Sequence, residues 1–336
     1  MPIDKPVTLS DVAAHAGVSV ATASKALNDR DQVRASTKQR VLKAARELGF
    51  TPNALAKGLL SGRSGTVGLI THDLEGRFSI PILMGVEDAF GAERVSVFLT
   101  DARGDAIRER YHLEALLSRR VDGIIVVGDQ TNARPSLGHE LAVPVVYAYA
   151  PSADSSDCSV IFDNVGAGRL SIDHLLSCGR SRIGIVTGDP TYGAAQERAQ
   201  GALAALKEAD LAPISDPSFG TWTESWGRGA TRLLLAKYPN IDALLCGSDL
   251  IARGALDALR ERGLEVPTDV AVMGHDNWEV LATGARVPLT SVDMNLEELG
   301  RRAATRLAEA IEGNPHSGID MITGRIVTRK STAPLD

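Results

Sequence analysis

Aromatic residues and cysteines are scarce in this 336-residue sequence, and long apolar runs are missing. Aromatic residues make up 4% of the chain, and the three cysteines, Cys158, Cys178 and Cys246, form no CxxC pair. No window approaches the roughly 18 consecutive apolar residues that a membrane helix needs, and the N-terminus lacks the basic flank and apolar core of a signal peptide. We therefore expect a cytoplasmic protein with no membrane partner, whose thiols form neither a disulfide nor a metal site.

Motifs of the common enzyme classes are also missing. The chain has no GxxxxGK[ST], no GxSxG and no HExxH, and its seven histidines show no metal-ligand spacing. The stretch GAGRLS at residues 166–171 looks like a dinucleotide-binding loop, but Ser171 stands where the third glycine belongs. We therefore expect no enzyme, no cofactor and no metal ion.

Charge is distributed unevenly along the chain. The formal net charge is −6, yet residues 1–63 hold ten Lys or Arg against five Asp or Glu, a balance of +5 that leaves −11 for the rest. Such asymmetry indicates a basic module for a polyanion joined to an acidic body with another task. A solvated charged face explains the same numbers, so charge alone does not decide between the two.

The basic segment begins with two short helices joined by a tight turn. Thr8 has the spacing to cap a first helix with Asp11 at the N3 position. Gly17 permits the turn, and Ser19 can cap a second helix that runs to about Asn28. Two such helices bury too little surface to be stable alone, because isolated helices shorter than about 12–15 residues are marginal in water.

A third helix is predicted in the stretch RASTKQRVLKAARELGF. Ser36 and Gln39 have the spacing of a capping box, and Gly49 is a C-terminal stop signal. An apolar stripe of Val41, Ala45 and Leu48 faces the other two helices. Three short helices around one small core are typical of a helix-turn-helix unit.

The second helix of such a unit enters the major groove of DNA. Val20, Ala21 and Lys25 lie on its outward face, where a lysine can donate to guanine and the small apolar side chains can contact a thymine methyl. Hydroxyl side chains and the basic residues of the third helix suit phosphate contacts. The predicted DNA-contacting residues of this segment are Thr8, Ser19, Val20, Ala21, Thr22, Ser24, Lys25 and Asn28.

A conditional helix is predicted next, in FTPNALAKGLL, because Asn53 can cap a short run of small and apolar residues that has no domain of its own to pack on. With this PN..A..L pattern, residues 7–70 resemble the LacI family of bacterial transcription repressors. The resemblance implies that Asn53 caps a hinge helix, that Ala56 makes the close contact between paired hinge helices, and that Leu59 wedges into the minor groove at the operator centre. Packing of Leu59 on the body is the alternative.

The acidic body alternates short apolar runs with amphipathic helical patterns. The runs TVGLI, VSVFLT, DGIIVVG, PVVYAYA, RIGIVTG, DALLCGSD and VAVMGHD are typical of parallel strands covered on both faces. They are too many for one compact sheet, so we expect an α/β body of two doubly wound lobes. This arrangement is similar to the family's body, which resembles periplasmic sugar-binding proteins.

The resemblance also implies domain boundaries. We expect a helix-turn-helix domain at 1–51, a hinge helix and linker at 52–65, and an effector-binding and dimerisation body at 66–336. By the same analogy the chain crosses between lobes near Phe162, Ser291 and Thr323. The N-lobe then comprises about 66–162 and 292–323, and the C-lobe about 163–291 and 324–336.

Ligands of open α/β sheets bind beyond the carboxyl ends of the strands, and the residues that follow the predicted strands are candidates for an effector site. The resemblance assigns Arg198 and Asp276 to effector hydroxyls and Trp222 to an aromatic wall. The whole predicted set is Leu74, Phe78, Tyr192, Arg198, Trp222, Asp249 and Asp276. A plain salt bridge between Arg198 and Asp276, and a core position for Trp222, are the alternatives. Trp226 either packs or extends the pocket, and the pattern gives Trp278 no role.

Taken together, these features favour a repressor that binds a palindromic operator as a homodimer. Its affinity for the operator then changes when a small molecule bridges the lobes. Arginine, aspartate and aromatic faces suit a sugar or oligosaccharide. A co-repressor of the purine-base class is the alternative, although Tyr192 and Ala194 stand where a purine reader of the family has polar contacts. The chain ends without the leucine heptads that make some relatives tetrameric, so we expect a dimer.

Overall fold

The computed structural model describes residues 7–27, 33–50, 63–74, 77–93 and 95–332. By internal contacts the chain forms two compact units, Met1–Gly65 and Thr66–Asp336. Each unit is built around its own apolar core. Among the described residues, no helix combines the length and the apolar character required to cross a membrane.

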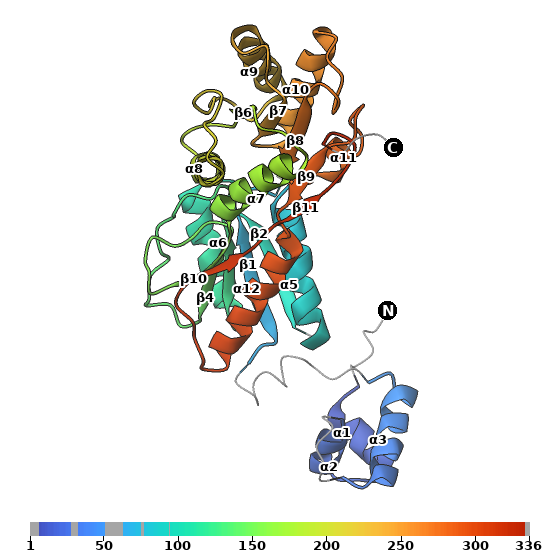
Figure 1. Cartoon of the computed structure of the whole chain (residues 1–336). Helices are drawn as coiled ribbons and strands as arrows, with labels where there is room; N and C mark the ends of the chain where they lie inside the picture. The colour runs from blue at the N-terminus through green and yellow to red at the C-terminus, as the bar shows by residue number, and fades with distance from the viewer. Residues whose placement is uncertain (1–6, 28–32, 51–62, 75–76, 94, 333–336) are drawn as a thin grey trace, which may run out of the picture. The chain divides into compact units, whose positions relative to one another are not determined.

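The N-terminal unit contains the three predicted helices (Figure 1), which are α1 (Leu9–Ala16), α2 (Val20–Leu27) and α3 (Ala35–Glu47). The predicted capping box is confirmed, because the Thr8 hydroxyl accepts from the Asp11 amide and the Asp11 carboxylate accepts from the Thr8 amide. Gly17 has a φ of 62°, a left-handed conformation that suits glycine and turns the chain toward α2. Ser19 Oγ accepts from the Thr22 amide at 3.2 Å and caps α2 as predicted.

The start of α3 differs from the prediction. Arg34, with an extended ψ of 141° and no side-chain capping bond, is the N-cap, so Ser36 already lies inside the first turn. The predicted Ser36 cap is wrong because a capping side chain must belong to a residue with non-helical backbone. The helix does stop before Gly49, which has a φ of 65°. The three helices bury a small core of valine and alanine: Val12, Ala13, Ala16, Ala23, Ala26, Val41, Ala44 and Ala45.

The body contains two sheets, which confirms the predicted α/β class with two parallel-stranded lobes. We call the parts built around them the N-lobe and the C-lobe. The N-lobe sheet is wholly parallel, with order β10-β5-β4-β3-β1-β2. Its strands are β1 (Thr66–Thr71), β2 (Ser96–Asp101), β3 (Ile124–Val127), β4 (Val145–Ala148), β5 (Cys158–Phe162) and β10 (Gly318–Ile322).

The C-lobe sheet has order β11-β9-β8-β7-β6, and β11 alone pairs antiparallel. Its strands are β6 (Ile183–Val186), β7 (Ala243–Cys246), β8 (Ala271–His275), β9 (Thr290–Asp293) and β11 (Arg325–Val327). Strands β6, β7 and β8 are buried along their whole length, as expected of strands covered on both faces.

Helices pack against these sheets, and most of them form pairs. They are α5 (Ser79–Glu93), α6 (Ala106–Ser118), α7 (Asn164–Ser177), α8 (Gly193–Glu208), α9 (Glu224–Lys237), α10 (Asp249–Glu261), α11 (Glu279–Ala282) and α12 (Leu296–Ile311). The pairs are α5 with α12, α7 with α8, and α9 with α10. A Cβ added at Gly300 would lie 2.0 Å from the Ile82 carbonyl, so this glycine lets α12 and α5 approach closely.

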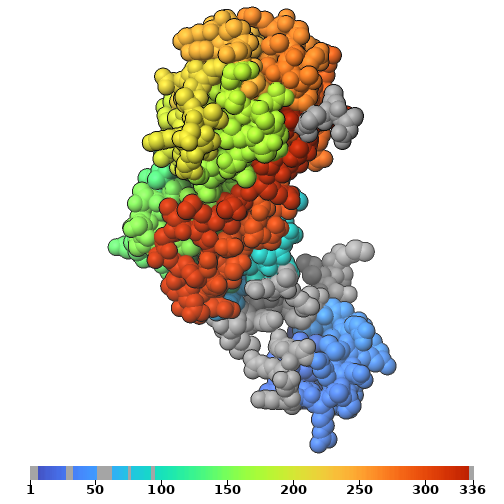
Figure 2. Space-filling view, viewed as in Figure 1, coloured from blue at the N-terminus to red at the C-terminus, as the bar shows by residue number. Residues whose placement is uncertain are grey.

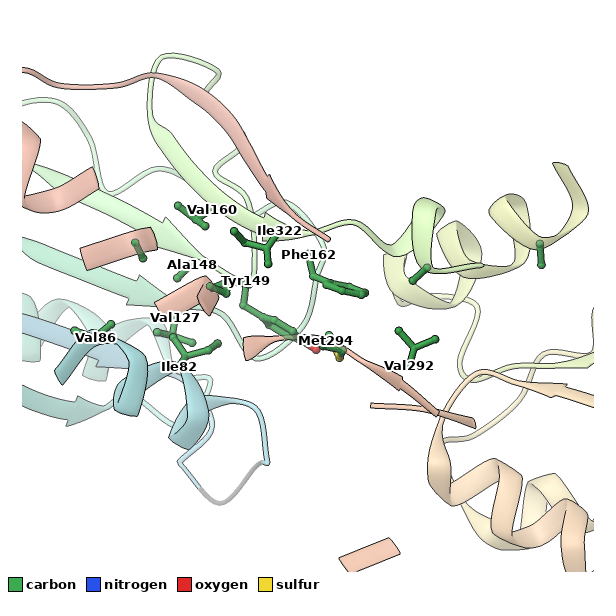
Figure 3. Packing of buried hydrophobic residues seen from close by; sticks show 14 of the residues in the cluster. Ile82, Val86, Val127, Ala148, Tyr149, Val160, Phe162, Val292, Met294 and Ile322 are labelled. Carbon is green, nitrogen blue, oxygen red and sulfur yellow. The ribbon is translucent and has the colours of Figure 1, made fainter. Parts of the chain in front are cut away.

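The chain passes between the lobes three times, after β5, after β9 and between β10 and β11. In Figure 2 the red atoms of the last segment run along both lobes. One apolar core continues through the crossings, where Phe162, Val292 and Met294 are buried beside N-lobe residues such as Tyr149 (Figure 3). The lobes therefore share one apolar core at the crossings.

Candidate functional site

A cavity of about 340 Å³ lies beyond the carboxyl ends of the strands, lined by residues of both lobes. We call it the effector cavity. N-lobe loops after β1, β3 and β4 face C-lobe loops after β6 and β8 across it, which is the place where open α/β sheets bind ligands. Its lining residues are Asp73, Arg77, Phe78, Asp129, Thr131, Tyr149, Tyr192, Ala194, Arg198, Trp222, Leu250, Asp276 and Trp278.

Asp276 follows β8 in a strained backbone conformation. Its φ is 98°, and Asn277 after it has a φ of 49°, both in a region that non-glycine residues rarely adopt. The turn is held because the Asp276 amide donates to the Val292 carbonyl at 3.0 Å, and Arg329 donates to Asn277 Oδ1 at 2.7 Å. Strain that the surroundings hold in place is frequent at ligand sites and identifies this turn as a candidate.

Two guanidinium groups face the Asp276 carboxylate, whose side chain is 2% exposed. Arg77 from the N-lobe forms an ion pair with Oδ2, and Arg198 Nη1 lies 3.7 Å from Oδ1. Burial raises the pKa of Asp276, and the two positive charges oppose that effect. Arg198 itself is fixed by its bonds to Asn164 Oδ1 at 2.9 Å and to the Gly247 carbonyl at 2.7 Å. The salt bridge between Arg198 and Asp276, which was the alternative to an effector role, is present, and both side chains also line the cavity.

Aromatic rings form the walls of the cavity. Phe78 stacks on Tyr149 with ring centroids 5.1 Å apart, and Tyr192 meets Trp222 edge to face at 6.0 Å. A Cβ at Gly188 would lie 2.2 Å from the Trp222 ring, so that glycine lets the indole lie against the backbone. The Trp222 Nε1 donor is buried without a hydrogen-bond partner among the described residues.

Two of the predicted effector residues do not line the cavity. Leu74 is absent from its wall. Asp249, the first residue of α10, is fully buried, and its carboxylate accepts from Ser291 Oγ at 2.7 Å and from the Trp278 amide at 2.8 Å. Burial, together with repulsion by Asp276, raises the pKa of Asp249 to about 7. Asp249 therefore holds the strained turn through these hydrogen bonds and does not face the cavity.

The structure brings together Phe78, Tyr192, Arg198, Trp222 and Asp276, and it adds wall residues that the sequence pattern did not single out. Arg77, Tyr149 and Trp278 are the main additions. Arg77 lies in the loop after the first strand, from which only Leu74 and Phe78 were predicted. Trp226 packs in the C-lobe, where its Nε1 donates to the Thr187 carbonyl at 2.9 Å, and does not line the cavity.

A second set of contacts joins the lobes at the rim of the cavity. The N-cap residue of α8, Tyr192, makes no side-chain capping bond. Instead the free amides of Gly193 and Ala194 donate to Asn132 Oδ1 at 2.7 Å and to Thr131 Oγ1 at 2.8 Å. Asn132 Nδ2 also donates to the Thr191 carbonyl at 2.8 Å. The N-lobe thus caps a C-lobe helix, which couples the helix end to the lobe arrangement.

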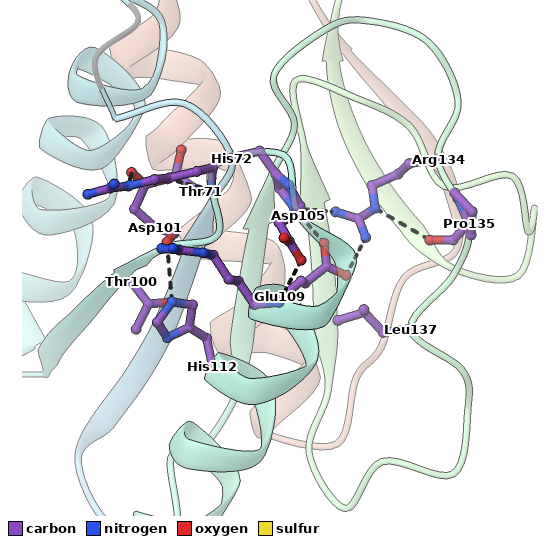
Figure 4. Close-up of polar contacts among 12 residues, drawn as sticks. Thr71, His72, Thr100, Asp101, Asp105, Glu109, His112, Arg134, Pro135 and Leu137 are labelled. Atoms are coloured by element: carbon purple, nitrogen blue, oxygen red, sulfur yellow. Dashed lines mark hydrogen bonds and ion pairs between the residues drawn. The ribbon is translucent and has the colours of Figure 1, made fainter.

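The loop that carries these caps is anchored by a buried polar cluster in the N-lobe (Figure 4). The Glu109 carboxylate accepts from Arg134 Nη2 at 2.6 Å and contacts His72 Nε2 at 2.5 Å. Burial alone raises the pKa of Glu109, but the hydrogen bonds from His72 and Arg134 outweigh it and lower the pKa to about 2. Glu109 is therefore ionised at neutral pH and holds α6 to the loop after β3.

In the N-terminal unit, the predicted base-reading residues lie on the surface of α2. Val20, Ala21 and Lys25 are exposed, while Ala23 and Ala26 of the same helix are buried. The Ser19 and Thr22 hydroxyls bond each other at 2.8 Å. Of the remaining predicted DNA contacts, Thr8 and Ser24 are described, and Asn28, Asn53, Ala56 and Leu59 lie outside the described residues. In the described part of the chain, no group of His, Cys, Asp and Glu side chains is arranged to hold a metal ion.

Two sequence profiles match the chain. That of the bacterial regulatory proteins, lacI family, matches residues 8–53, and that of the periplasmic binding protein-like domain matches residues 172–332. The HTH-type transcriptional regulator CelR of Thermobifida fusca is 34% identical over 327 residues, 94% of this chain and 95% of CelR. The HTH-type transcriptional repressor PurR of Haemophilus influenzae (strain PittEE) is 33% identical over 336 residues, 96% of this chain and 98% of PurR.

Solved structures show the same architecture. The Lac repressor dimer bound to operator and the anti-inducer ONPF aligns with a TM-score of 0.78 at 28% identity, covering 98% of this chain and 100% of that one. A CelR–cellobiose complex aligns with a TM-score of 0.65 at 31% identity, covering 97% and 99%. Fold and site define a helical DNA-reading unit joined to a two-lobed ligand-binding body. The chain belongs to the lacI family and is a DNA-binding transcriptional repressor with a ligand-binding domain.

Proposed function

We propose that this repressor is controlled by a neutral sugar or oligosaccharide bound in the effector cavity. The observation that carries the proposal is the Asp276 carboxylate, whose Oδ1 has no hydrogen-bond partner among the described residues and which stands between aromatic walls. A carboxylate accepts hydrogen bonds from vicinal hydroxyls, and aromatic rings cover the apolar C–H face of a sugar. The unpartnered Trp222 Nε1 supplies a donor for a sugar oxygen.

A second candidate effector is a purine-like base that acts as a co-repressor. The relative named PurR supports this candidate, and the solved CelR–cellobiose complex supports the sugar. The cavity favours the sugar, because Ala194 offers no polar side chain to a purine at the rim. The ion pairs of Asp276 with Arg77 and Arg198, and the unpartnered Trp222 Nε1, suit a ligand with many hydroxyls. A titration with both ligand classes separates the candidates.

On the DNA side, we propose that α2 enters the major groove, with Lys25 donating to a guanine and Val20 and Ala21 contacting bases. Ser19, Thr22, Ser24 and Thr8 then contact phosphates, and Asn28 completes the set at the end of the helix. The hinge roles of Asn53, Ala56 and Leu59 remain proposals that rest on the family resemblance.

We further propose that the protein binds a palindromic operator as a homodimer. Large apolar side chains are exposed on three N-lobe elements, α5, α6 and the edge strand β2. These elements are neighbours, because both helices pack against β2. The exposed residues are Ile80, Met84, Phe98, Leu99, Ile107 and Tyr111. Exposed apolar side chains concentrated on adjoining elements are typical of a subunit interface. A two-fold dimer then presents two copies of α2 to two half-sites.

The experiment that tests this function is selection of DNA sequences that bind the full-length protein, followed by anisotropy titrations of the selected site. We expect a two-fold symmetric site whose affinity changes when a sugar is added. Selected sequences without symmetry would contradict the dimer, and an affinity that responds to a purine base but to no sugar would contradict the proposed effector class.

A further inference from the structure

A second cavity, of about 400 Å³, shares a wall with the effector cavity. Four residues line both cavities: Arg77, Phe78, Asp276 and Trp278. The other walls of the second cavity come from the start of α12 and from the chain crossings around β9 and β11. We call it the crossover cavity.

The partition between the two cavities is a contact between the lobes. The Arg77 guanidinium comes from the N-lobe loop after β1 and forms an ion pair with Asp276 of the C-lobe. The same guanidinium lies 4.7 Å from the centroid of the Phe78 ring and 5.1 Å from that of Trp278. One long side chain, held by one carboxylate and two rings, thus separates two spaces of similar size.

Arg77 is less firmly held than Arg198, the other arginine at this carboxylate. Its Nε is buried without a hydrogen-bond partner among the described residues, and its side chain is 17% exposed against 7% for Arg198. If Arg77 rotates toward solvent, the Arg198 guanidinium still places a positive charge 3.7 Å from the Asp276 carboxylate. Rotation would uncover the two aromatic faces and would leave Asp276 free to accept new hydrogen bonds.

These contacts define what can replace Arg77. A ligand hydroxyl pair takes over the hydrogen bonds to Asp276, and a ring with an apolar face takes the place of the guanidinium between Phe78 and Trp278. Ligand cavities in proteins span roughly 300–1,000 Å³, so each space alone is small and the two joined are large enough for several sugar rings.

We propose that the effector is an oligosaccharide that occupies both cavities, and that it does so by displacing the Arg77 guanidinium from Asp276. This inference rests on the proposed sugar effector and adds the length of the ligand and a specificity role for Arg77. A single sugar ring fills the effector cavity and leaves the ion pair in place. An oligosaccharide of three or four rings takes the place of the Arg77 guanidinium and extends through both cavities.

Calorimetric titration of the full chain with glucose oligomers of one to four rings, in a β-1,4 and an α-1,4 series, tests the proposal. In one of the two series we expect affinity to rise by about tenfold or more between two and four rings. Glu279→Trp crowds the crossover cavity alone, since Glu279 lines that cavity and not the other and is exposed. Val280→Trp is the matched control, because Val280 is 72% exposed and lines neither cavity.

Glu279→Trp should lower affinity for the four-ring sugar by about tenfold and leave the one-ring sugar unchanged, whereas Val280→Trp should change neither. Arg77→Ala should raise the ratio of four-ring to one-ring affinity, because no ion pair has to be displaced, and Arg77→Lys should stay closer to the wild type. Short sugars that bind as tightly as long ones, with no effect of Glu279→Trp, would overturn this inference and leave the proposed function intact. Binding of a purine base and of no sugar would overturn both.

Discussion

Arg198 Nη1 lies 3.7 Å from Asp276 Oδ1, and both side chains are almost fully buried at the junction of the two lobes. Arg198 belongs to α8 and donates hydrogen bonds to Asn164 and to the Gly247 carbonyl, so it presents a fixed positive charge to the carboxylate. Asp276 sits on a strained turn with one oxygen left unpartnered among the described residues. A buried carboxylate that is charge-compensated yet free to accept a hydrogen bond is what a polyhydroxylated ligand requires.

The first prediction concerns Asp276. Asp276→Ala should abolish the effector response and leave operator affinity within about twofold of the wild type, because the carboxylate lies in the body and not in the DNA-reading unit. Operator titrations with and without sugar measure both quantities. Asp216→Ala, at an exposed site outside the cavity wall, is the control and should keep the response. An Asp276→Ala protein that still responds to sugar would contradict the assigned role.

Lys25 provides the second prediction. Lys25→Ala should cost about 1–3 kcal/mol on the specific operator if Lys25 contacts a guanine, with a much smaller loss on unrelated DNA. Lys207→Ala in the body removes the same charge and should leave both affinities unchanged. Titrations at several salt concentrations distinguish the roles, since loss of a phosphate contact alone weakens all sequences alike and flattens the salt dependence. Equal losses on operator and unrelated DNA would exclude base reading by Lys25.

The rim contacts lead to a third prediction. Asn132→Ala removes two hydrogen bonds that the N-lobe makes with the start of α8, and each such bond is worth about 0.5–1.5 kcal/mol. The lobe arrangement that these bonds hold should therefore be less populated, and effector affinity should fall by roughly fivefold or more. Calorimetry on Asn132→Ala and on the exposed Asn314→Ala control measures the effect. Unchanged affinity would mean that these bonds do not favour the liganded state.

Asp249 provides a fourth prediction, on the pH dependence of stability. Its pKa is raised from 3.8 to about 7, so the folded protein holds a proton that the unfolded chain releases. The stabilisation from this group is fully present below pH 4 and is lost as pH rises through about 7. Glu109, whose pKa is lowered to about 2, stays ionised throughout that window and does not mask the effect.

Urea unfolding of the wild type and of Asp249→Asn, at pH 5 and at pH 8, measures this contribution. Asn cannot titrate, so the wild type should lose more stability between the two pH values than the variant does, by on the order of 1–2 kcal/mol. The variant is expected to be less stable overall, because an amide cannot accept from both Ser291 and the Trp278 amide. Parallel pH profiles for the two proteins would contradict the raised pKa.

Most of the fold follows from local patterns in the sequence. The Thr8–Asp11 box, the Gly17 turn and the Ser19 cap are short-range features, and the structure contains all three. Every apolar run that was expected to be a strand is one, although β2, at the edge of its sheet, is not buried as the prediction of strands covered on both faces implied. Strands β9, β10 and β11 were not predicted, because their residues show no continuous apolar run of their own. They are strands because the sheets of the two lobes pair with them.

The site was only partly predictable, for a different physical reason. Position after a strand indicated the right loops, but it does not fix the direction of a side chain. Asp249 begins α10 and points back toward Ser291, whereas Asp276 faces the cavity. Arg77 was missed as a partner of Asp276 because the two are 199 residues apart and meet only when the lobes come together.

Tryptophan fluorescence reports directly on whether a sugar binds at Asp276 between the lobes, because Trp222 and Trp278 line the cavity. The protein is titrated with a panel of mono- and oligosaccharides and purine bases, beside Trp222→Phe and Asp276→Ala. We expect a saturable change in fluorescence with one sugar, which is smaller in Trp222→Phe and absent in Asp276→Ala. A response to a purine base with none to any sugar would contradict the proposed sugar effector.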